Sequence, residues 1–320
     1  MENTFTSISI QNFITESGAI YKTINLSYQV FGPALATAPV VLVNHALTGN
    51  SQVTGEKGWW SAIVGDYKVI DTRNYSVLAF NIPGNGFDNE LIATYLDFNV
   101  RDIARLFLEG IKALKIQQLY AIIGGSIGGG IAWEMIALQP EITQNLIPIA
   151  TDWKSTDWMI ANCFAQERIL QNSSKPIEDA RIQAMLMYRT PASFKAKFNR
   201  TINKELSIFN IESWLNHHGK KLQERYQLAA YKMMNQLLKT IDITRNSADF
   251  AAFASKIKAS IHIIAIDSDL FFTANENQET YLELKKHHKK VTYQEILSPH
   301  GHDAFLIEYQ QLEKILAPLF

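Results

Sequence analysis

Short continuous runs of apolar residues recur along the chain, separated by stretches in which apolar residues return every three or four positions. Short apolar runs of this kind are typical of strands buried on both faces of a parallel sheet. We predict such strands at 39–44, 75–81, 119–123, 146–150, 261–266 and 291–297. The helical spacing predicts helices at 99–115, 131–138, 275–287 and 303–316. This alternation predicts an α/β fold with a mostly parallel central sheet and helices on both faces.

The first part of the chain has a different pattern. Residues 4–14 and 20–31 alternate between apolar and polar side chains, Gly18 lies between them, and Gly32 and Pro33 follow the second run. Alternation with period two predicts half-buried strands, and a short connection between two such strands favours antiparallel pairing. We therefore expect an antiparallel pair at one edge of the sheet.

Residues 152–250 interrupt the alternation of strands and helices. Helical patterns cover 158–171, 177–187 and 219–241, and no run in this region clearly predicts a strand. Because the sheet pattern resumes at 261, we interpret 152–250 as a helical lid, in preference to a separate helical domain. The lid would be inserted into one α/β core formed by residues 1–151 and 251–320. It would lie over the C-terminal edge of the sheet, where open α/β folds place their sites.

Composition and charge exclude several classes of function. The 320 residues include 30 Lys and Arg and 31 Asp and Glu, so the net charge is −1 and no basic stripe suggests nucleic acid or a membrane surface. No apolar run approaches the ~20 residues that span a bilayer, and the first residues lack the pattern of a secretory signal. Cys163 is the only cysteine, which fits a reducing compartment. We expect a cytoplasmic protein with no nucleic-acid or membrane partner and no metal site.

A Gly-x-Ser-x-Gly motif follows the predicted strand at 119–123. Gly124, Ser126 and Gly128 form the motif, and a helical pattern begins soon after it. In a strand–turn–helix context this motif holds a nucleophilic serine at a strained turn, with the backbone N–H of the next residue, here Ile127, facing the same space. A plain turn rich in small residues is the alternative, and the flanking strand and helix favour the nucleophile.

A nucleophilic serine needs a base and a group that orients the base. Asp267 and Asp269 follow the strand at 261–266, and His300 and His302 follow the strand at 291–297. The C-terminal ends of parallel strands lie on one rim of a sheet, so these side chains should share that rim with Ser126. Spacing alone does not choose between the two aspartates or between the two histidines.

Several motifs together resemble the homoserine O-acetyltransferase family, whose members have the α/β-hydrolase fold. The match runs in order from about residue 38 to residue 320. The residues that carry it are 45–49 (His-Ala-Leu-Thr-Gly), 58–60 (Gly-Trp-Trp), 70–72 (Ile-Asp-Thr), 124–129 (Gly-Gly-Ser-Ile-Gly-Gly), 179–181 (Asp-Ala-Arg), 185–190 (Met-Leu-Met-Tyr-Arg-Thr), 266–269 (Ile-Asp-Ser-Asp) and 298–306 (Ser-Pro-His-Gly-His-Asp-Ala-Phe-Leu). Most α/β-hydrolases lack the first and the last of these segments.

The resemblance implies an acyltransferase that moves acetyl from acetyl-CoA to the hydroxyl of L-homoserine by a ping-pong mechanism, in methionine biosynthesis. It implies a catalytic triad of Ser126, Asp269 and His302. It further implies that the backbone N–H groups of Leu47 and Ile127 form the oxyanion hole, that Arg181 binds the substrate carboxylate, and that Asp303 binds its ammonium group. Acetyl-CoA would be a co-substrate with no tightly bound cofactor beside it. The family also implies a homodimer formed through the lid helices.

One segment departs from the family. The loop at 82–89, Ile-Pro-Gly-Asn-Gly-Phe-Asp-Asn, is shorter than the family's loop and lacks its Cys and its Ser-Thr-Gly-Pro. Succinyl-CoA as donor, or another hydroxy amino acid as acceptor, therefore stays an alternative. An esterase, in which water takes the place of homoserine, is another. A non-catalytic binding protein is a third, and the intact triad argues against it.

Overall fold

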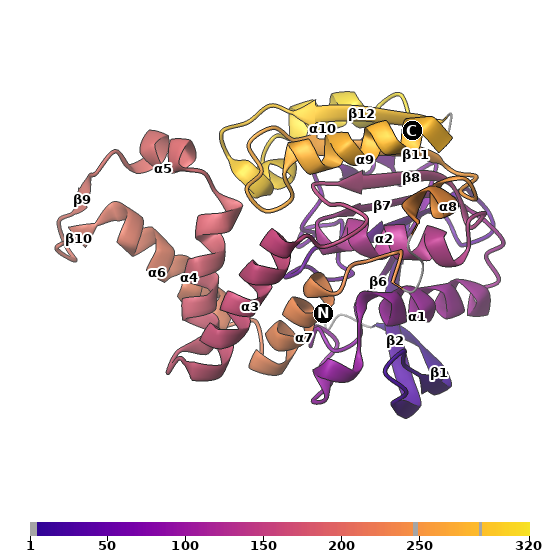
Figure 1. Ribbon diagram of the computed structural model, residues 1–320, viewed down its shortest axis with the longest axis horizontal. Helices are drawn as coiled ribbons and strands as arrows, with labels where there is room; N and C mark the ends of the chain where they lie inside the picture. The colour runs from indigo at the N-terminus through magenta and orange to yellow at the C-terminus, as the bar shows by residue number, and fades with distance from the viewer. Residues whose placement is uncertain (1–4, 246–248, 288–289) are drawn as a thin grey trace.

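The computed structural model describes residues 5–245, 249–287 and 290–320, and these form an α/β fold around an eight-stranded sheet. The strand order is β1-β2-β6-β3-β7-β8-β11-β12, from the lower right of Figure 1 to its top. The strands are β1 (Thr6–Ile14), β2 (Ile20–Phe31), β3 (Val40–Asn44), β6 (Ser76–Phe80), β7 (Leu119–Gly125), β8 (Thr143–Ile149), β11 (Ser260–Ile266) and β12 (Val291–Ile296). All the predicted strands are present; residue 4, where the first was expected to begin, lies outside the described residues.

The sheet is parallel except at one edge. β1 pairs with β2 and β2 with β6 in antiparallel register, whereas the ladders from β6 through β12 are parallel. The predicted antiparallel edge pair and mostly parallel sheet are thus confirmed. After β3 the chain adds β6 on one side of β3, and it then crosses to add β7 on the other side. The C-terminal ends of β3 and β7 therefore form a topological switch point, the place where open α/β sheets bind ligands.

Each face of the sheet packs against its own layer. On β3, Val40 and Leu42 belong to one buried cluster, and Val41 and Val43 belong to the other, because successive side chains of a strand point to opposite faces. The first cluster includes residues of α1 (Val100–Ala113), α2 (Ile127–Leu138), α8 (Phe250–Ala254) and α9 (Ala274–His287). The second includes residues of α10 (Tyr309–Leu316), together with the segment that carries β4 (Val64–Gly65) and β5 (Ile70–Asp71). Helices on both faces were predicted, and they explain why the parallel strands are continuously apolar.

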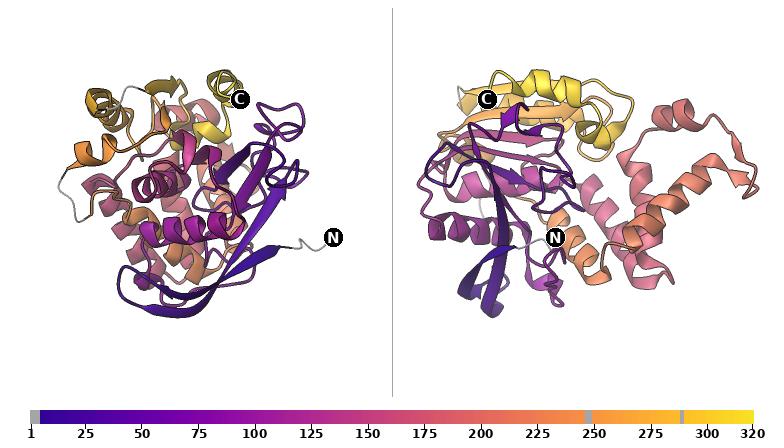
Figure 2. Two further views of the ribbon diagram at one scale, coloured as in Figure 1. Left: turned by 90° about the vertical axis from the view of Figure 1, so that its right-hand side faces the viewer. Right: turned by 180° about the vertical axis from the view of Figure 1, so that it is seen from behind.

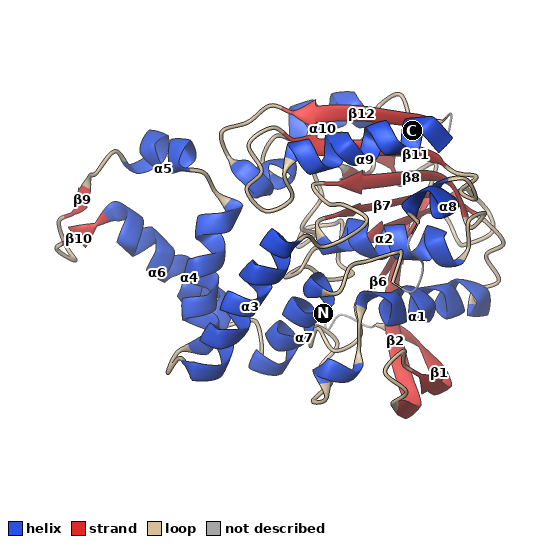
Figure 3. Ribbon diagram, viewed as in Figure 1, coloured by secondary structure: helices blue, strands red, loops and turns tan. Residues whose placement is uncertain are grey.

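A group of helices stands at the C-terminal edge of the parallel strands, toward which the strand arrowheads point in Figure 3. We call residues 157–239 the lid segment. Its elements are α3 (Asp157–Asn172), α4 (Pro176–Tyr188), α5 (Pro191–Phe198), β9 (Ile202–Asn203), β10 (Ile208–Phe209), α6 (Asn210–Gln223) and α7 (Leu228–Lys239). In Figures 1 and 2, α5, β9, β10 and part of α6 extend away from the core as an arm.

The lid segment differs from the sequence expectation in two places. The helix expected at 219–241 is the end of α6 and all of α7, separated by residues 224–227. A small hairpin, β9 with β10, occurs where no strand was expected. Both differences come from turns that the apolar spacing does not reveal, one in the arm and one between α6 and α7.

The two places where the chain crosses between the core and the lid segment are joined to each other. Ser155 N–H donates to Ile241 O at 2.8 Å, and Ile243 N–H donates to Trp153 O at 3.2 Å. The Trp153 ring stacks on Phe250, with ring centroids 4.4 Å apart. The lid segment is therefore attached to the core by a paired double connection.

The last predicted helix is also divided. Residues 303–316 were expected to form one helix, but the chain forms a 3-10 helix, η2 (Gly301–Leu306), and then α10. Glu308, between them, accepts a hydrogen bond from Ser298 Oγ at 2.8 Å, which ties this turn to the preceding loop. A further short 3-10 helix, η1 (Tyr95–Asp97), precedes α1.

Candidate active site

Ser126 occupies a one-residue turn between β7 and α2. Its backbone has φ 56° and ψ −128°, a conformation that costs energy for a residue with a Cβ and is concentrated at functional sites. Its N–H donates to Ile149 O at 2.9 Å, and the side chain is almost fully buried. Helix α2 begins directly after it at Ile127, four residues earlier than the helical pattern at 131–138 had indicated.

The glycines around Ser126 allow this turn. A Cβ added to Gly124 would lie 2.5 Å from the Gly128 carbonyl carbon, and one added to Gly128 would lie 2.4 Å from Asn44 O. A Cβ on Gly125 would lie 2.5 Å from the Phe305 ring. Small residues are therefore required for β7, α2 and η2 to meet, and the end of β7 is in direct contact with the helix that carries His302.

Asp269 and His302 form a buried hydrogen-bonded pair. His302 Nδ1 lies 2.8 Å from Asp269 Oδ2. The other carboxylate oxygen, Oδ1, accepts the backbone N–H groups of Phe271 at 2.6 Å and Phe272 at 3.1 Å. Both oxygens of this buried carboxylate thus have donors, and Nε2 of His302 is left to face another group.

The alternatives that spacing left open, Asp267 and His300, have other partners. Asp267 is exposed, and its Oδ1 accepts the N–H of Ser298 at 2.9 Å. His300 Nδ1 lies 2.9 Å from Ser193 Oγ, at the beginning of α5. Neither contact brings these residues into the pair formed by Asp269 and His302.

Aromatic rings surround His302. The centroids of Phe271, Tyr188, Phe305 and Phe272 lie 5.0, 5.6, 5.9 and 6.0 Å from the imidazole centroid. Tyr188 comes from the end of α4 in the lid segment, whereas the other three come from the core. The lid segment therefore completes the packing that fixes the histidine ring.

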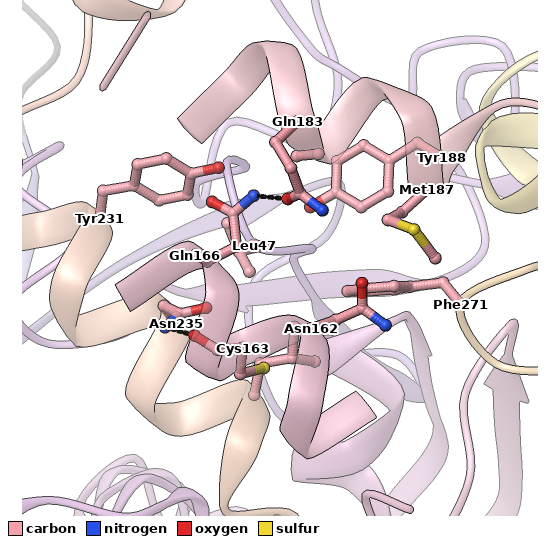
Figure 4. A pocket seen from close by; sticks show the side chains of 12 residues that line it. Leu47, Asn162, Cys163, Gln166, Gln183, Met187, Tyr188, Tyr231, Asn235 and Phe271 are labelled. Atoms are coloured by element: carbon pink, nitrogen blue, oxygen red, sulfur yellow. Dashed lines mark hydrogen bonds between the residues drawn. The ribbon is translucent and has the colours of Figure 1, made fainter. Parts of the chain in front are cut away.

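A narrow pocket lies beneath the lid segment beside this ring cluster, with about 300 Å³ of empty space including its mouth (Figure 4). It is lined by Leu47, Asn162, Cys163, Gln166, Gln183, Ala184, Met187, Tyr188, Tyr231, Asn235, Leu238 and Phe271. Tyr188 and Phe271, whose rings pack on His302, connect the pocket to the region around the histidine. The neutral amides of Gln166 and Gln183 contact each other inside it.

The loop that carries Leu47 is held by His45. Ile82 N–H donates to His45 Nε2 at 3.0 Å, so Nδ1 carries the proton and donates to Ala46 O at 2.8 Å. Burial lowers the pKa of His45 to about 4, so the ring stays neutral at physiological pH. Ile127, for its part, is the first residue of α2, whose first four N–H groups have no acceptor within the helix.

Arg181 and Asp303, the two residues expected to bind the acceptor, have different surroundings. The Arg181 guanidinium carbon is 5.5 Å from the Tyr188 ring centroid, and among the described residues Arg181 forms no ion pair. Asp303 already has a cationic partner, because Arg189 Nε donates to its Oδ2 at 3.0 Å. Sequence reasoning gave Arg189 no role, although it directly follows Tyr188 in a segment that matches the family.

Within the described residues there is no group of three or more His, Cys, Asp or Glu side chains that could hold a metal ion. A search of the same residues for a helix long and apolar enough to cross a membrane finds none.

Comparison with known proteins identifies the relatives of this chain. A family model described as the alpha/beta hydrolase fold matches residues 39–309. The homoserine O-acetyltransferase of Cyclobacterium marinum is 31% identical over 95% of this chain and 92% of its own length, and that of Salinibacter ruber is 27% identical over 97% and 96%.

Among solved structures, the homoserine O-acetyltransferase of Bacillus anthracis has a TM-score of 0.88 at 20% identity, covering 99% of this chain and 97% of its own. Esterase E22 has the same TM-score at 17% identity, covering 99% of each chain, so the fold by itself does not separate the two activities. The chain is an acyltransferase of the homoserine O-acetyltransferase family, within the α/β-hydrolase fold.

Proposed function

We propose that this protein transfers an acetyl group from acetyl-CoA to the hydroxyl of L-homoserine through an acyl-Ser126 intermediate. The observations that carry the proposal are the buried pair of Asp269 and His302 and the strained turn that presents Ser126. The two are linked because Phe305, on the 3-10 helix of His302, lies against Gly125. This arrangement suits nucleophilic acyl transfer, because a serine hydroxyl becomes a good nucleophile only beside an oriented base.

The first half-reaction forms the acyl-enzyme. His302 Nε2 takes the proton of the Ser126 hydroxyl while Oγ attacks the thioester carbonyl carbon. The negative charge that develops on the carbonyl oxygen is stabilised by the N–H groups of Leu47 and Ile127. When the tetrahedral intermediate collapses, the C–S bond breaks and the thiolate of CoA takes the proton from His302.

The second half-reaction repeats these steps with the acceptor. The homoserine hydroxyl gives its proton to His302 and attacks the acyl carbon, and Ser126 leaves as the alcohol. Asp269 holds the imidazole in the tautomer that this cycle needs. Arg181 binds the carboxylate of the acceptor and Asp303 its ammonium group, which places the hydroxyl at the acyl-enzyme.

Water must be kept from the acyl-enzyme for transfer to exceed hydrolysis. We assign this role to a lid formed by residues 152–250 over a core of residues 1–151 and 251–320. The position of Tyr188 against His302 and the narrowness of the pocket support this division.

The wider biological context belongs to the same proposal. O-Acetylhomoserine would serve methionine biosynthesis, and acyl-CoA as donor fits a cytoplasmic enzyme. A homodimer through the lid helices is supported by the exposed apolar side chains of Trp158 and Phe164 on α3, and by Leu206 in the hairpin that precedes α6. Sedimentation of wild type and of Leu206→Asp tests it; a monomeric wild-type protein would contradict it.

Ester hydrolysis is a second candidate, and one observation favours it. The carboxylate of Asp303 is paired with Arg189, so an acceptor ammonium group must share it. Water needs no such site. Succinyl-CoA, or another hydroxy amino acid, remains the alternative within the transferase class.

Thiol release from acetyl-CoA, measured with and without L-homoserine, separates these functions. The transferase gives a burst of one thiol per site without acceptor and steady turnover only when homoserine is added. Intact-mass spectra should show one added acetyl group, which Ser126→Ala abolishes. Steady thiol release that homoserine does not change would identify a hydrolase, and turnover by a wild-type protein that never becomes acetylated would point to direct transfer.

A further inference from the structure

The lid segment reaches the loop that carries Leu47 through two consecutive residues. Tyr226 Oη donates to Leu47 O at 3.0 Å, and both groups are buried. Arg225 Nη1 donates to Thr48 O at 3.1 Å. Both donors come from the connection between α6 and α7, which is far from residues 47 and 48 in sequence. The carbonyl groups of this loop are therefore held from the lid side.

The core holds the same loop from the other side. Ala46 O accepts both His45 Nδ1–H and Gly49 N–H, each at 2.8 Å. In a planar trans peptide the C=O and the N–H point in opposite directions, so anchoring Ala46 O also fixes the direction of the Leu47 N–H. The peptide before Leu47 is thus oriented by the core, and the peptide after it is oriented by Tyr226.

We propose that Tyr226 is a positioning residue that completes the oxyanion hole, so that the Leu47 N–H is fully aligned only when the α6–α7 connection of the lid segment is seated. The proposal rests on the proposed function in one respect, namely that Leu47 supplies an oxyanion donor to Ser126. Fixing the peptides on both sides of Leu47 restricts its two backbone dihedral angles, and an oxyanion donor acts by being aligned before charge develops. The lid segment would then contribute to the chemical step as well as to the exclusion of water.

The surroundings of Tyr226 suit this role. Its side chain is 7% exposed, and burial raises the pKa of its hydroxyl, so the group remains a proton donor. Its ring packs edge-on against Tyr231 at 6.1 Å, so the ring can stay in place when the hydroxyl is removed. Tyr226→Phe therefore deletes one hydrogen bond and little else.

The test compares Tyr226→Phe with Tyr75→Phe. Tyr75 Oη also donates to a backbone carbonyl at 3.0 Å, that of Phe320, on the side of the core formed with α10. Acylation of Ser126 by p-nitrophenyl acetate is followed by stopped flow, and binding of butylboronic acid, which forms a tetrahedral adduct on a serine, is measured by titration. Melting temperatures are recorded for both variants.

We expect Tyr226→Phe to slow acylation about 10-fold, less than the ~10²–10³ that follows loss of an oxyanion donor itself. Affinity for the boronic acid should fall by a similar factor, with little change in the apparent dissociation constant of p-nitrophenyl acetate. Tyr75→Phe should leave all three quantities unchanged while lowering the melting temperature by a comparable amount.

Unchanged acylation and unchanged boronic acid affinity in Tyr226→Phe would overturn the proposal, as would equal losses in Tyr75→Phe. Because p-nitrophenyl acetate requires neither acetyl-CoA nor homoserine, this result is independent of which donor and acceptor the enzyme uses. A failure of homoserine-dependent turnover in the wild type would instead contradict the proposed function alone.

Discussion

Arg189 Nε donates to Asp303 Oδ2 at 3.0 Å, which joins the end of α4 to the 3-10 helix that carries His302. Two neighbouring contacts also join the residues after α4 to the loop that precedes this helix. Thr190 Oγ1 donates to Pro299 O at 2.5 Å, and Ser193 Oγ lies 2.9 Å from His300 Nδ1. Residues 189–193 of the lid segment therefore hold the loop from which the proposed base projects.

The strength of the Arg189–Asp303 pair can be measured directly. The two side chains are 20% and 18% exposed, so solvent screens the pair only in part. A double-mutant cycle with Arg189→Ala and Asp303→Ala on the free energy of unfolding should give a coupling of about 1–3 kcal/mol. The same cycle on the exposed pair Lys286 and Glu283 should give a coupling that is not measurably different from zero. Equal couplings would mean that the contact with Asp303 is only a surface ion pair.

Arg181 should act on the acceptor and not on the donor. Removing the partner of a buried substrate charge costs roughly 2–5 kcal/mol, so Arg181→Ala should raise the KM for L-homoserine by ~30-fold or more. Acyl-enzyme formation from acetyl-CoA, followed by stopped flow, should change little. Arg168→Ala, an exposed arginine on α3, is the matched control and should change neither quantity. If acylation slows as much as turnover, Arg181 serves the CoA side or the fold of the lid segment, and its assignment to homoserine fails.

The two aspartates after β11 should differ sharply. Asp269→Asn should lower kcat by ~10³–10⁴-fold, because an amide beside Nδ1 favours the wrong imidazole tautomer. Asp267→Asn keeps an oxygen for the Ser298 N–H and should change kcat by less than ~3-fold, as expected for an exposed surface substitution. Steady-state rates with circular dichroism spectra for both variants test this. The reverse order of effects would assign the acid to Asp267.

Glu134 on α2 should be essential for stability. It is fully buried, and its carboxylate accepts Arg101 Nε at 2.7 Å and Arg245 Nη2 at 3.0 Å. Arg101 and Arg245 also donate to backbone carbonyl oxygens of residues 240–243, where the chain returns from the lid segment. Glu134→Ala should therefore cost about 3 kcal/mol in the free energy of unfolding, because two largely buried cations lose their buried partner and keep only the more exposed Glu16.

Urea denaturation of Glu134→Ala and of Lys286→Ala provides the comparison. Lys286 forms an exposed pair with Glu283, and the loss of this pair should change the free energy of unfolding far less than Glu134→Ala does. Similar losses in the two variants would show that the Glu134 cluster contributes no more than a surface ion pair does.

Asp152 should make stability depend on pH. Its pKa is raised to about 7, mainly by burial and to a smaller extent by Glu276, which together outweigh the lowering by the hydrogen bonds from Trp153 and Thr280 and by the charge of Lys154. An unfolded Asp titrates near 3.9, so from about pH 4 to 7 the native state holds a proton that the unfolded state has lost. The stability that this proton supplies is complete below about pH 4 and is lost as the pH rises through about 7.

Asp152→Asn removes this proton and with it the pH dependence. The free energy of unfolding of the variant relative to wild type should therefore rise between pH 4 and pH 8, by on the order of 1.4 kcal/mol for each unit of the pKa shift. Urea denaturation of both proteins at several pH values measures the difference, in which the other titrating groups cancel. A difference that does not change with pH would contradict the raised pKa.

The strands were predictable because a strand that is buried on both faces consists of consecutive apolar residues. β3 and β6 are buried at every position, and apart from Asn44 and Ser76 at their ends all their residues are apolar. Helix boundaries were less predictable. The glycines after Ser126 resemble a turn, yet they form the first turn of α2. They lack a Cβ because Gly128, Gly129 and Gly130 lie directly against Asn44, Thr151 and Ile241. The single helix expected at 303–316 is broken at Ile307 and Glu308 by a contact with Ser298, which no local pattern records.

The sequence by itself determined the order of the elements, the serine turn and the two strand ends from which the acid and base must come. These features depend on local spacing and on residue type. Spacing did not choose between the two aspartates or the two histidines, and the family resemblance favoured Asp269 and His302. Only the tertiary structure shows these two side chains hydrogen-bonded, while Asp267, in the same loop, binds Ser298. It also joined Arg189 to Asp303 and Tyr226 to Leu47, pairs separated by more than a hundred residues. Such contacts form when the lid segment packs against the edge of the sheet. The local sequence pattern around each residue does not reveal which distant residue it will contact.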